Sequence, residues 1–466
     1  PPPVHLKKTR PKRLAHKNSR FTLTTIILCC AVVLVLNPAV IKAQKLPDFS
    51  TVAKKAPEGL KEKAQTKRSA LFFIKGSSQS ESHTYVGFFV GEEGLAVCPL
   101  HPFCKKQSLN FHMGDKARTA LKHPSVIAVF PQKELVLVKF AHKPKAAASL
   151  SISTKATPIG TWIAVIPTEA APTNPILGPI LSHRTATIDH AVRSQRKAPK
   201  QFSFATGRGP SQSIALRPGA PVINQNSEVV AVFSNSMPLP AQTFRLACPT
   251  TGLTERIAEA VKKDKKLKVP LSAEDHRLDP VEFSNDWMEL GSCLSEPNPD
   301  YAKAHLITRE LVKKFPESFI AQKQEYIIES MKLNSEDANP TLLVKHAQGF
   351  EHMSKAKSPA VQSFYWGTLG EALLAANKLD EAAAALKKSD EIYPAGGACS
   401  TLAQVMRRKG NLAEAENYYR RAAILVPERI AIWDDLQRVL SKNGKSKEAS
   451  EALDMIFLLE SFYRNH

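Results

Sequence analysis

The chain has 466 residues, 43% of them hydrophobic, and a formal net charge of +21. This length predicts two or more domains, each with a core of its own. Its seven cysteines show no C-x-x-C or Cys/His metal spacing, which argues against a zinc site and favours buried free thiols. No other sequence pattern calls for a metal or a cofactor.

The charge is distributed unevenly along the chain. Residues 1–20 hold seven Lys or Arg and no acid, and residues 69–269 hold 25 basic and 11 acidic residues, a net charge of +14. Residues 270–466, with 24 basic and 29 acidic residues, have a net charge of −5. A basic part beside a mildly acidic one predicts attraction to anionic surfaces or between the two parts. No nucleic-acid partner is expected, because the chain has no RNA- or DNA-binding motif and no platform of aromatic and basic residues.

The N-terminal residues predict a membrane segment. Residues 21–41 are uncharged and mostly apolar, and about 20 such residues suffice to cross a bilayer. The basic segment 1–20 precedes this run, so we expect that segment to stay in the cytoplasm. Residues 21–43 should then lie in the inner membrane as a transmembrane helix or signal anchor, and the remainder of the chain in the periplasm. A cleaved signal peptide ending near Ala43 is the alternative. Residues 44–68, rich in Lys, Ala and Pro, predict a juxtamembrane linker.

Residues 69–263 have the pattern of an all-β domain. Short alternating or apolar runs, such as LFFI, VGFFV, LVLVKF and VVAVFS, are broken by Gly, Pro and Ser, which is typical of an antiparallel barrel or sandwich. The polar, basic stretch 185–208 predicts a loop, and residues 251–263 predict a short terminal helix. Residues 264–280 then predict a linker to the next domain.

Three motifs in this region resemble those of HtrA-like (DegP-type) serine proteases of the trypsin class. Residues 85–102, YVGFFVGEEGLAVCPLHP, resemble the element that ends in the general-base histidine, and His101 falls on that position. Residues 134–140, ELVLVKF, resemble the element that begins with the orienting aspartate, here Glu134. The resemblance implies a double β-barrel and a catalytic triad. Cys98 and Cys104 flank His101, and whether they pair stays open.

The third motif departs from the family at the nucleophile. The family presents its serine in a G-x-S-G-x-P turn before an apolar strand pair, which residues 221–224 and 228–232 match. Pro218 occupies the serine position if no gap is allowed; otherwise three residues, the serine included, are deleted. Proline supplies no nucleophile in either alignment. Ser211 and Ser213 come too early, and Ser227 falls in the following hairpin.

From residue 281 to residue 466 the pattern is helical and repeats. Its spacing resembles the W-x2-L-G…A-x3-F…P skeleton of the tetratricopeptide repeat (TPR), through Trp366, Leu369, Gly370, Ala382, Leu386 and Pro394. Ala382, Ala415 and Ala449 are 33 and 34 residues apart, which matches a helix pair of about 34 residues. Residues 287–316 resemble an earlier unit, and residues 319–357 a looser helix pair.

Such arrays bind protein segments in a groove lined by the first helix of each unit. The register places four cations there, where they could hold a peptide carboxylate: Arg407, Arg408, Arg438 and Lys442. A solvated charged surface is the alternative. Tyr418, Tyr419 and Trp433 are expected in the core between units.

Taken together, the patterns predict a multidomain protein with a trypsin-like double β-barrel, a TPR solenoid and an N-terminal transmembrane helix. We expect a membrane-anchored binding or scaffold protein of a bacterial cell envelope, with His101 and Glu134 as remnants of a triad. The alternative is an active HtrA-like serine endopeptidase whose nucleophile lies elsewhere in the chain.

Overall fold

The structure of the chain is a computed structural model. It describes residues 56–76, 84–104, 108–114, 119–168, 175–185, 200–205, 217–233, 244–263, 265–272, 279–295, 300–335 and 340–464. All described residues belong to one compact unit, residues 46–466. The predicted basic segment 1–20 and membrane segment 21–43 therefore lie outside the described residues. None of the described helices is long and apolar enough to cross a membrane.

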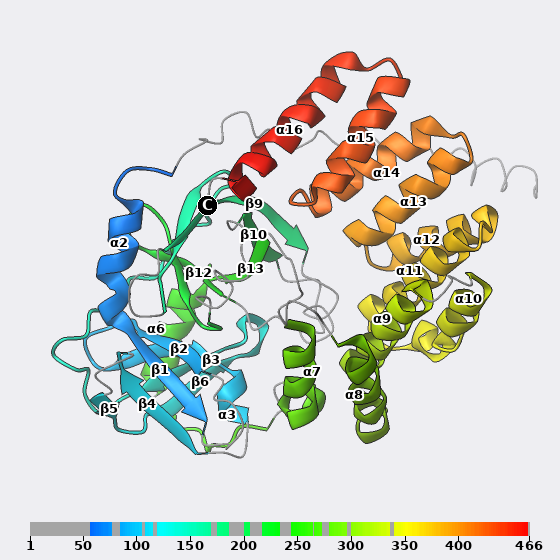
Figure 1. The fold of residues 1–466 in the computed structure, drawn as a ribbon. Coiled ribbons are helices and arrows are strands. Elements are labelled where there is room, and N and C mark those ends of the chain that lie inside the picture. Colours follow the sequence, from blue (N-terminus) through cyan, green and yellow to red (C-terminus); the bar gives the residue numbers. More distant parts are fainter. Residues whose placement is uncertain are drawn as a thin grey trace, which may run out of the picture. The chain divides into compact units, whose positions relative to one another are not determined.

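The first part of the described chain is rich in β-strands (Figure 1). A seven-stranded antiparallel sheet has the order β5-β4-β1-β2-β3-β7-β6. Its outermost strands, β5 and β6, are joined by only three residues, 122–124, so the sheet must curve until its two edges approach each other. Its strands are β1 (Leu71–Gly76), β2 (Thr84–Phe89), β3 (Leu95–Pro99), β4 (Leu109–Met113), β5 (Thr119–Leu121), β6 (Ser125–Phe130) and β7 (Leu135–Lys139).

Apolar side chains that alternate along the strands fill the inside of this sheet. Phe72 and Ile74 of β1 point into one apolar cluster while Phe73, between them, belongs to another, as the two-residue period of a strand requires. In the cluster of Phe72, the ring centroids of Phe89 and Phe140 each lie 5.1 Å from that of Phe72 and 5.5 Å from each other. These aromatic contacts make the interior of the sheet a packed core.

Six further strands form a closed barrel in the order β10-β13-β12-β11-β8-β9. Its interior is lined by short apolar side chains, Ile163, Val165, Val222 and Val230 among them. The strands are β8 (Trp162–Val165), β9 (Ile176–Thr185), β10 (Lys200–Ala205), β11 (Pro221–Ile223), β12 (Val229–Phe233) and β13 (Phe244–Pro249), and the predicted terminal helix follows as α6 (Leu253–Lys263).

Three segments of this part differ from the sequence-based prediction. The stretch 185–208 was expected to be a loop, but its residues 200–205 form β10. The end of the expected linker 44–68 is instead helical, as α2 (Leu60–Thr66) and the short η1 (Lys67–Ala70). Leu60 and Ala64, four residues apart on α2, are fully buried, and this apolar stripe packs the helix against β8.

The third difference concerns the expected linker 264–280. Backbone hydrogen bonds fasten its residues 265–272, here called the strap, to the edge strand β6 and to the short helix α3 (His101–Cys104). The amide of Leu267 donates to the Val126 carbonyl over 2.8 Å, and the amide of Leu271 donates to the Phe103 carbonyl over 2.9 Å. The Leu271 side chain is 6% exposed and joins the core of the sheet. A segment predicted to be a free connection is therefore part of the β-rich structure.

The second part of the chain is helical, and successive helices pack against each other (Figure 1). The elements are η3 (Pro280–Phe283), α7 (Asn285–Ser295), α8 (Tyr301–Lys314), α9 (Phe319–Ser335), α10 (Pro340–Gln348), η4 (Glu351–Lys355), α11 (Pro359–Ala375), α12 (Leu379–Ile392), α13 (Gly396–Arg408), α14 (Leu412–Leu425), α15 (Ile430–Lys442) and α16 (Ser446–Arg464).

The last three helix pairs repeat in geometry as well as in sequence. Each pair turns at a residue with positive φ, namely Asn377 (57°), Gly410 (80°) and Gly444 (75°). The positions are spaced by 33 and 34 residues, as are the predicted alanines. Ala382 and Ala415 have no exposed surface, and a Cβ at Gly370 would lie 2.4 Å from Leu386 Cγ. Small residues therefore let the two helices of a pair approach closely, which supports the predicted helical repeat.

Candidate functional site

The residues that resemble a catalytic histidine and acid lie at one end of the first sheet. His101 is the first residue of the short helix α3 (His101–Cys104), directly after β3. Glu134 adopts a left-handed conformation (φ 55°) between the short helix η2 (Pro131–Lys133) and β7. The amide of Leu100 donates to the Glu134 carbonyl over 2.8 Å, and Pro99 pairs with Leu135 across the two strands. The backbone thus holds the two segments next to each other.

The turn that contains Pro218 reaches the same place from the closed barrel. The amide of Val86 in β2 donates to the Pro218 carbonyl over 3.0 Å, and the Gly219 amide donates to the Phe233 carbonyl over 3.0 Å. Gly219 has a φ of 94°, and a Cβ on it would lie 2.0 Å from the Val86 carbonyl oxygen and 2.5 Å from Pro99 Cγ. The turn is therefore pressed onto the strands that lead to His101.

This turn offers no hydroxyl group. Residues 217–220 are Arg, Pro, Gly and Ala, and they continue directly into β11 at Pro221. Ser227 lies in the hairpin between β11 and β12, as expected, with a φ of 64°. Ser211 and Ser213 are outside the described residues.

The thiols near His101 are also poor nucleophiles. Cys98 and Cys104 are both free, so the pairing that the sequence left open is not formed. Burial raises the pKa of Cys104 to about 12 and raises the pKa of Cys98 well above its ordinary value. Because the thiolate is the reactive form of cysteine, neither side chain is activated at neutral pH.

The histidine itself is largely enclosed. His101 is 7% exposed, and its ring centroid lies 6.5 Å from that of Tyr85, which is 6% exposed. Leu100, next to it, is completely buried. What the site brings together is thus a buried imidazole, the backbone of Glu134 and a turn without a nucleophilic side chain. Among the described residues, no cluster of three or more His, Cys, Asp or Glu is placed to hold a metal ion.

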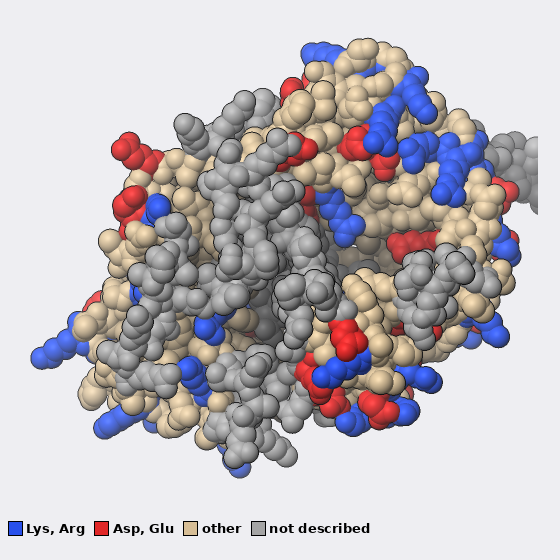
Figure 2. Space-filling model, in the orientation of Figure 1, with Lys and Arg blue, Asp and Glu red and all other residues tan. Residues whose placement is uncertain are grey.

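The four predicted groove cations lie on first helices of successive pairs, and three of them have contacts. Arg407 Nη1 of α13 lies 3.3 Å from Asp435 Oδ1 of α15, which joins two successive pairs. Arg438 pairs with Asp434 on its own helix at 2.6 Å, and Arg408 Nη1 donates to the Leu374 carbonyl over 3.5 Å. Lys442 is exposed. Figure 2 shows Lys and Arg side chains gathered over the C-terminal helices.

The helix ends offer a second explanation for some of these cations. Arg407 and Arg408 occupy the last turn of α13, and Lys442 occupies the last turn of α15. Cations at these positions are favoured by the partial negative charge of the helix C-terminus. The three residues expected in the core are confirmed there, since Tyr418, Tyr419 and Trp433 are 8%, 0% and 1% exposed.

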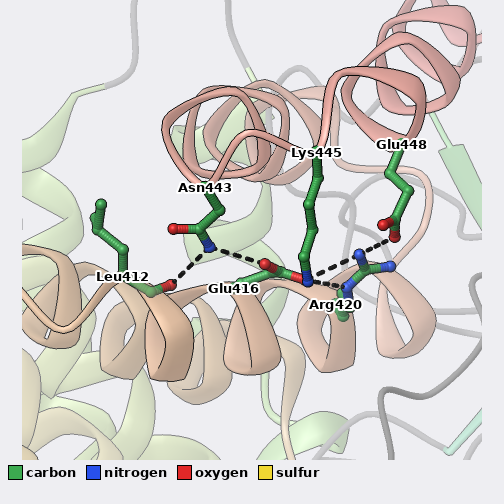
Figure 3. A network of polar contacts seen from close by, with 6 residues as sticks. All are labelled: Leu412, Glu416, Arg420, Asn443, Lys445 and Glu448. Carbon is green, nitrogen blue, oxygen red and sulfur yellow. Dashed lines mark hydrogen bonds and ion pairs between the residues drawn. The ribbon is translucent and has the colours of Figure 1, made fainter.

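A buried polar network that the sequence did not predict joins α14 to the turn before α16 (Figure 3). Glu416 is 3% exposed and accepts hydrogen bonds from Arg420 Nε (2.9 Å), Asn443 Nδ2 (2.8 Å) and Lys445 Nζ (2.8 Å). Arg420 also pairs with Glu448. Burial alone would raise the pKa of Glu416, but the hydrogen bonds from Lys445, Asn443 and Arg420 outweigh it and lower that pKa. The network fastens the last helix pair to the one before it.

The sequence contains a pattern for part of this network, but the pattern alone does not show that the residues are buried. Glu416 and Arg420 are four residues apart on one helix, a spacing that usually marks a solvent-exposed ion pair. Only the packing of the next pair shows that this one is buried.

Comparison with known proteins gives a limited result. No protein-family model matches the chain, and no curated protein matches it. Among solved structures, the chain is similar to the active form of the Rv3671c protease of M. tuberculosis, at 12% identity and a TM-score of 0.37, over 49% of this chain and 96% of that one. It is also similar to an inactive serine-to-alanine mutant of the same protein, at 12% identity and a TM-score of 0.34, over 47% of this chain and 99% of that one.

Proposed function

We propose that the protein is a binding or scaffold protein whose trypsin-like domain has lost its peptidase activity. The observation that carries this proposal is the turn at Pro218 and Gly219. In the trypsin mechanism the nucleophile contributes two groups, a hydroxyl that attacks and a backbone N–H that stabilises the oxyanion. Proline has neither group. The Pro218 carbonyl is also hydrogen-bonded to Val86, which ties the turn to β2.

The expected result is that the purified chain neither hydrolyses casein nor is labelled by a fluorophosphonate probe. Both reactions require an activated hydroxyl beside a base, and the turn at residues 217–220 has none. His101→Ala is the control, because trace hydrolysis by a contaminant would survive this substitution. Labelling that His101→Ala abolishes would contradict the proposal and favour the second candidate, an active HtrA-like endopeptidase.

The helical part is proposed to carry the binding function as a TPR-like array with its groove on the first helices. Its three regular pairs support this proposal, since α11, α13 and α15 follow one another in register at the repeat spacing. Arg407, Arg408, Arg438 and Lys442 would hold an acidic group of a protein or peptide partner. The proposal includes an anchor in the inner membrane at residues 21–43, with the bulk of the chain in the periplasm.

The groove predicts a difference between binding and stability. In the double variant Arg407→Ala with Arg438→Ala, capture of partners from a membrane extract should fall, since a hydrogen bond to a charged group contributes about 1.5–3 kcal/mol. The free energy of unfolding should change by only about 0.5 kcal/mol per arginine, because both side chains are at least one-third exposed and their ion pairs are screened.

The comparison is with Ala415→Leu, in which a larger side chain enters a position with no exposed surface. It should cost roughly 1–3 kcal/mol through overpacking. Thermal unfolding followed by circular dichroism measures both variants. If the arginine variant destabilises the fold as much as Ala415→Leu, the two arginines are structural and the groove assignment is wrong.

A further inference from the structure

The strap and the end of α6 carry a row of lysines. Residues 262–268 contain five lysines and one aspartate. Lys262, Lys265, Lys266 and Lys268 are exposed, and no carboxylate among the described residues lies within ion-pair distance of them. Lys263 pairs with Glu259 at 2.6 Å. Four of the five lysines are therefore cations that no described carboxylate neutralises.

The backbone holds this row on the surface of the first sheet. Leu267 forms an isolated bridge with Val126 and packs against the sheet core, and Leu271 is buried in that core. Because side chains alternate along an extended segment, Lys266 and Lys268 point away from the side on which Leu267 packs. These two cations are thus presented outward from a segment with a fixed path, which lowers the entropic cost of binding.

The form of the row indicates what kind of partner it fits. Its exposed lysines follow one another along the chain, which suits an extended anionic surface better than a single small anion. Val269 follows directly and is 44% exposed, although it is a large apolar residue. Lysines beside an exposed apolar side chain are suited to the headgroup region of a bilayer, where the charge meets phosphate and the apolar group meets the acyl boundary.

We infer that the lysine row of residues 262–268, with Val269, binds the surface of membranes that contain anionic lipids. The binding is electrostatic, so it weakens as the ionic strength rises. It does not depend on the peptidase site or on the helical groove, and it goes beyond the proposed anchor because it lies about 220 residues further along the chain.

Flotation with vesicles tests this inference, using residues 46–466, which form a compact unit with cores of their own. We expect this unit to bind vesicles of phosphatidylglycerol and phosphatidylcholine and not vesicles of phosphatidylcholine alone. The triple variant Lys265→Gln, Lys266→Gln, Lys268→Gln should lower the partition coefficient roughly a hundredfold, since each lysine near an anionic surface contributes about a factor of five.

The matched control removes the same charge elsewhere. Lys303, Lys313 and Lys314 each pair with an acid on the helices, so changing all three to Gln should leave vesicle binding nearly unchanged. Equal losses in both variants would mean that binding follows net charge alone, and this would overturn the inference. So would binding to neutral vesicles, or binding to single-stranded RNA with none to vesicles.

The full chain separates the strap from the anchor. If residues 21–43 insert in a membrane, the full chain stays with vesicles of phosphatidylcholine alone whether or not the strap lysines are present. Loss of the full chain from vesicles of phosphatidylcholine alone would count against the anchor. Absence of binding of residues 46–466 to anionic vesicles would count against the strap.

Discussion

Gly219→Ala is expected to destabilise the β-rich part by roughly 2–5 kcal/mol. The left-handed conformation costs a residue with a side chain about 1–2 kcal/mol, and overpacking adds about 1–3 kcal/mol. Both costs apply here, because Gly219 has a φ of 94° and the new Cβ would lie 2.0 Å from the Val86 carbonyl oxygen. That atom belongs to the backbone of β2, so it cannot rotate away. Urea unfolding followed by tryptophan fluorescence measures the loss, since Trp162 lies in β8 of the closed barrel.

Gly252→Ala is the matched control for this prediction. Gly252 also has a positive φ, of 73°, but a Cβ on it would meet nothing within 4 Å. Gly252→Ala should therefore lower the free energy of unfolding only by the cost of the left-handed conformation, about 1–2 kcal/mol. If the two variants are equally stable, the turn at Pro218 is not pressed against β2 and Pro99, and the description of the candidate site is wrong.

A comparably large effect is expected from Glu416→Ala in the helical part. Removing one partner of a buried ion pair leaves the other charge without compensation, at a cost of about 3–5 kcal/mol. Arg420, at 5% exposed, would be that charge, although Glu448 still contacts it. Asp434→Ala is the control, because its pair with Arg438 is exposed and should contribute about 0.3–0.5 kcal/mol. A loss as small as that of the control would mean that the network does not fasten the last pair.

The same carboxylate predicts how stability depends on pH. The pKa of Glu416 is lower in the folded chain than its ordinary value of 4.5. The unfolded chain therefore binds this proton more readily, so the stabilisation is present above about pH 4.5 and is lost as the pH falls below it. Glu416→Gln should remove this part of the acid sensitivity. Unfolding midpoints measured between about pH 3 and pH 7 for both chains give the comparison.

Local patterns explain what the sequence could predict. The spacing of Ala382, Ala415 and Ala449 reflects the need for small side chains where two helices touch, and that need acts within one repeat. All three are buried, on α12, α14 and α16. Alternation in the strands is equally local, which is why every described strand falls in the range predicted for the β domain, residues 69–263. The predicted His101, Glu134 and Pro218 segments are brought together because each stands at the end of such a strand.

Contacts between distant residues explain what the sequence could not predict. In β10 the pattern Phe-Ser-Phe is correct for a strand, but its neighbours are basic, and one of its partners, β13, comes only after β11 and β12. The strap has only two apolar anchors, Leu267 and Leu271, among many lysines, so its composition predicts a linker. Glu416 and Arg420 have the spacing of a surface pair. In each case the decisive partner is remote in sequence.

The strap also determines when the first sheet can be finished during synthesis. Leu271 fills part of the core beside Phe103, and Leu267 covers the open side of β6 at Val126. The ribosome makes these residues only after the whole closed barrel and α6. Until then, the earlier sheet exposes an apolar gap and an unpaired strand edge, a combination that invites aggregation. The nascent chain therefore passes through a vulnerable interval in which the first sheet lacks one short, lysine-rich segment.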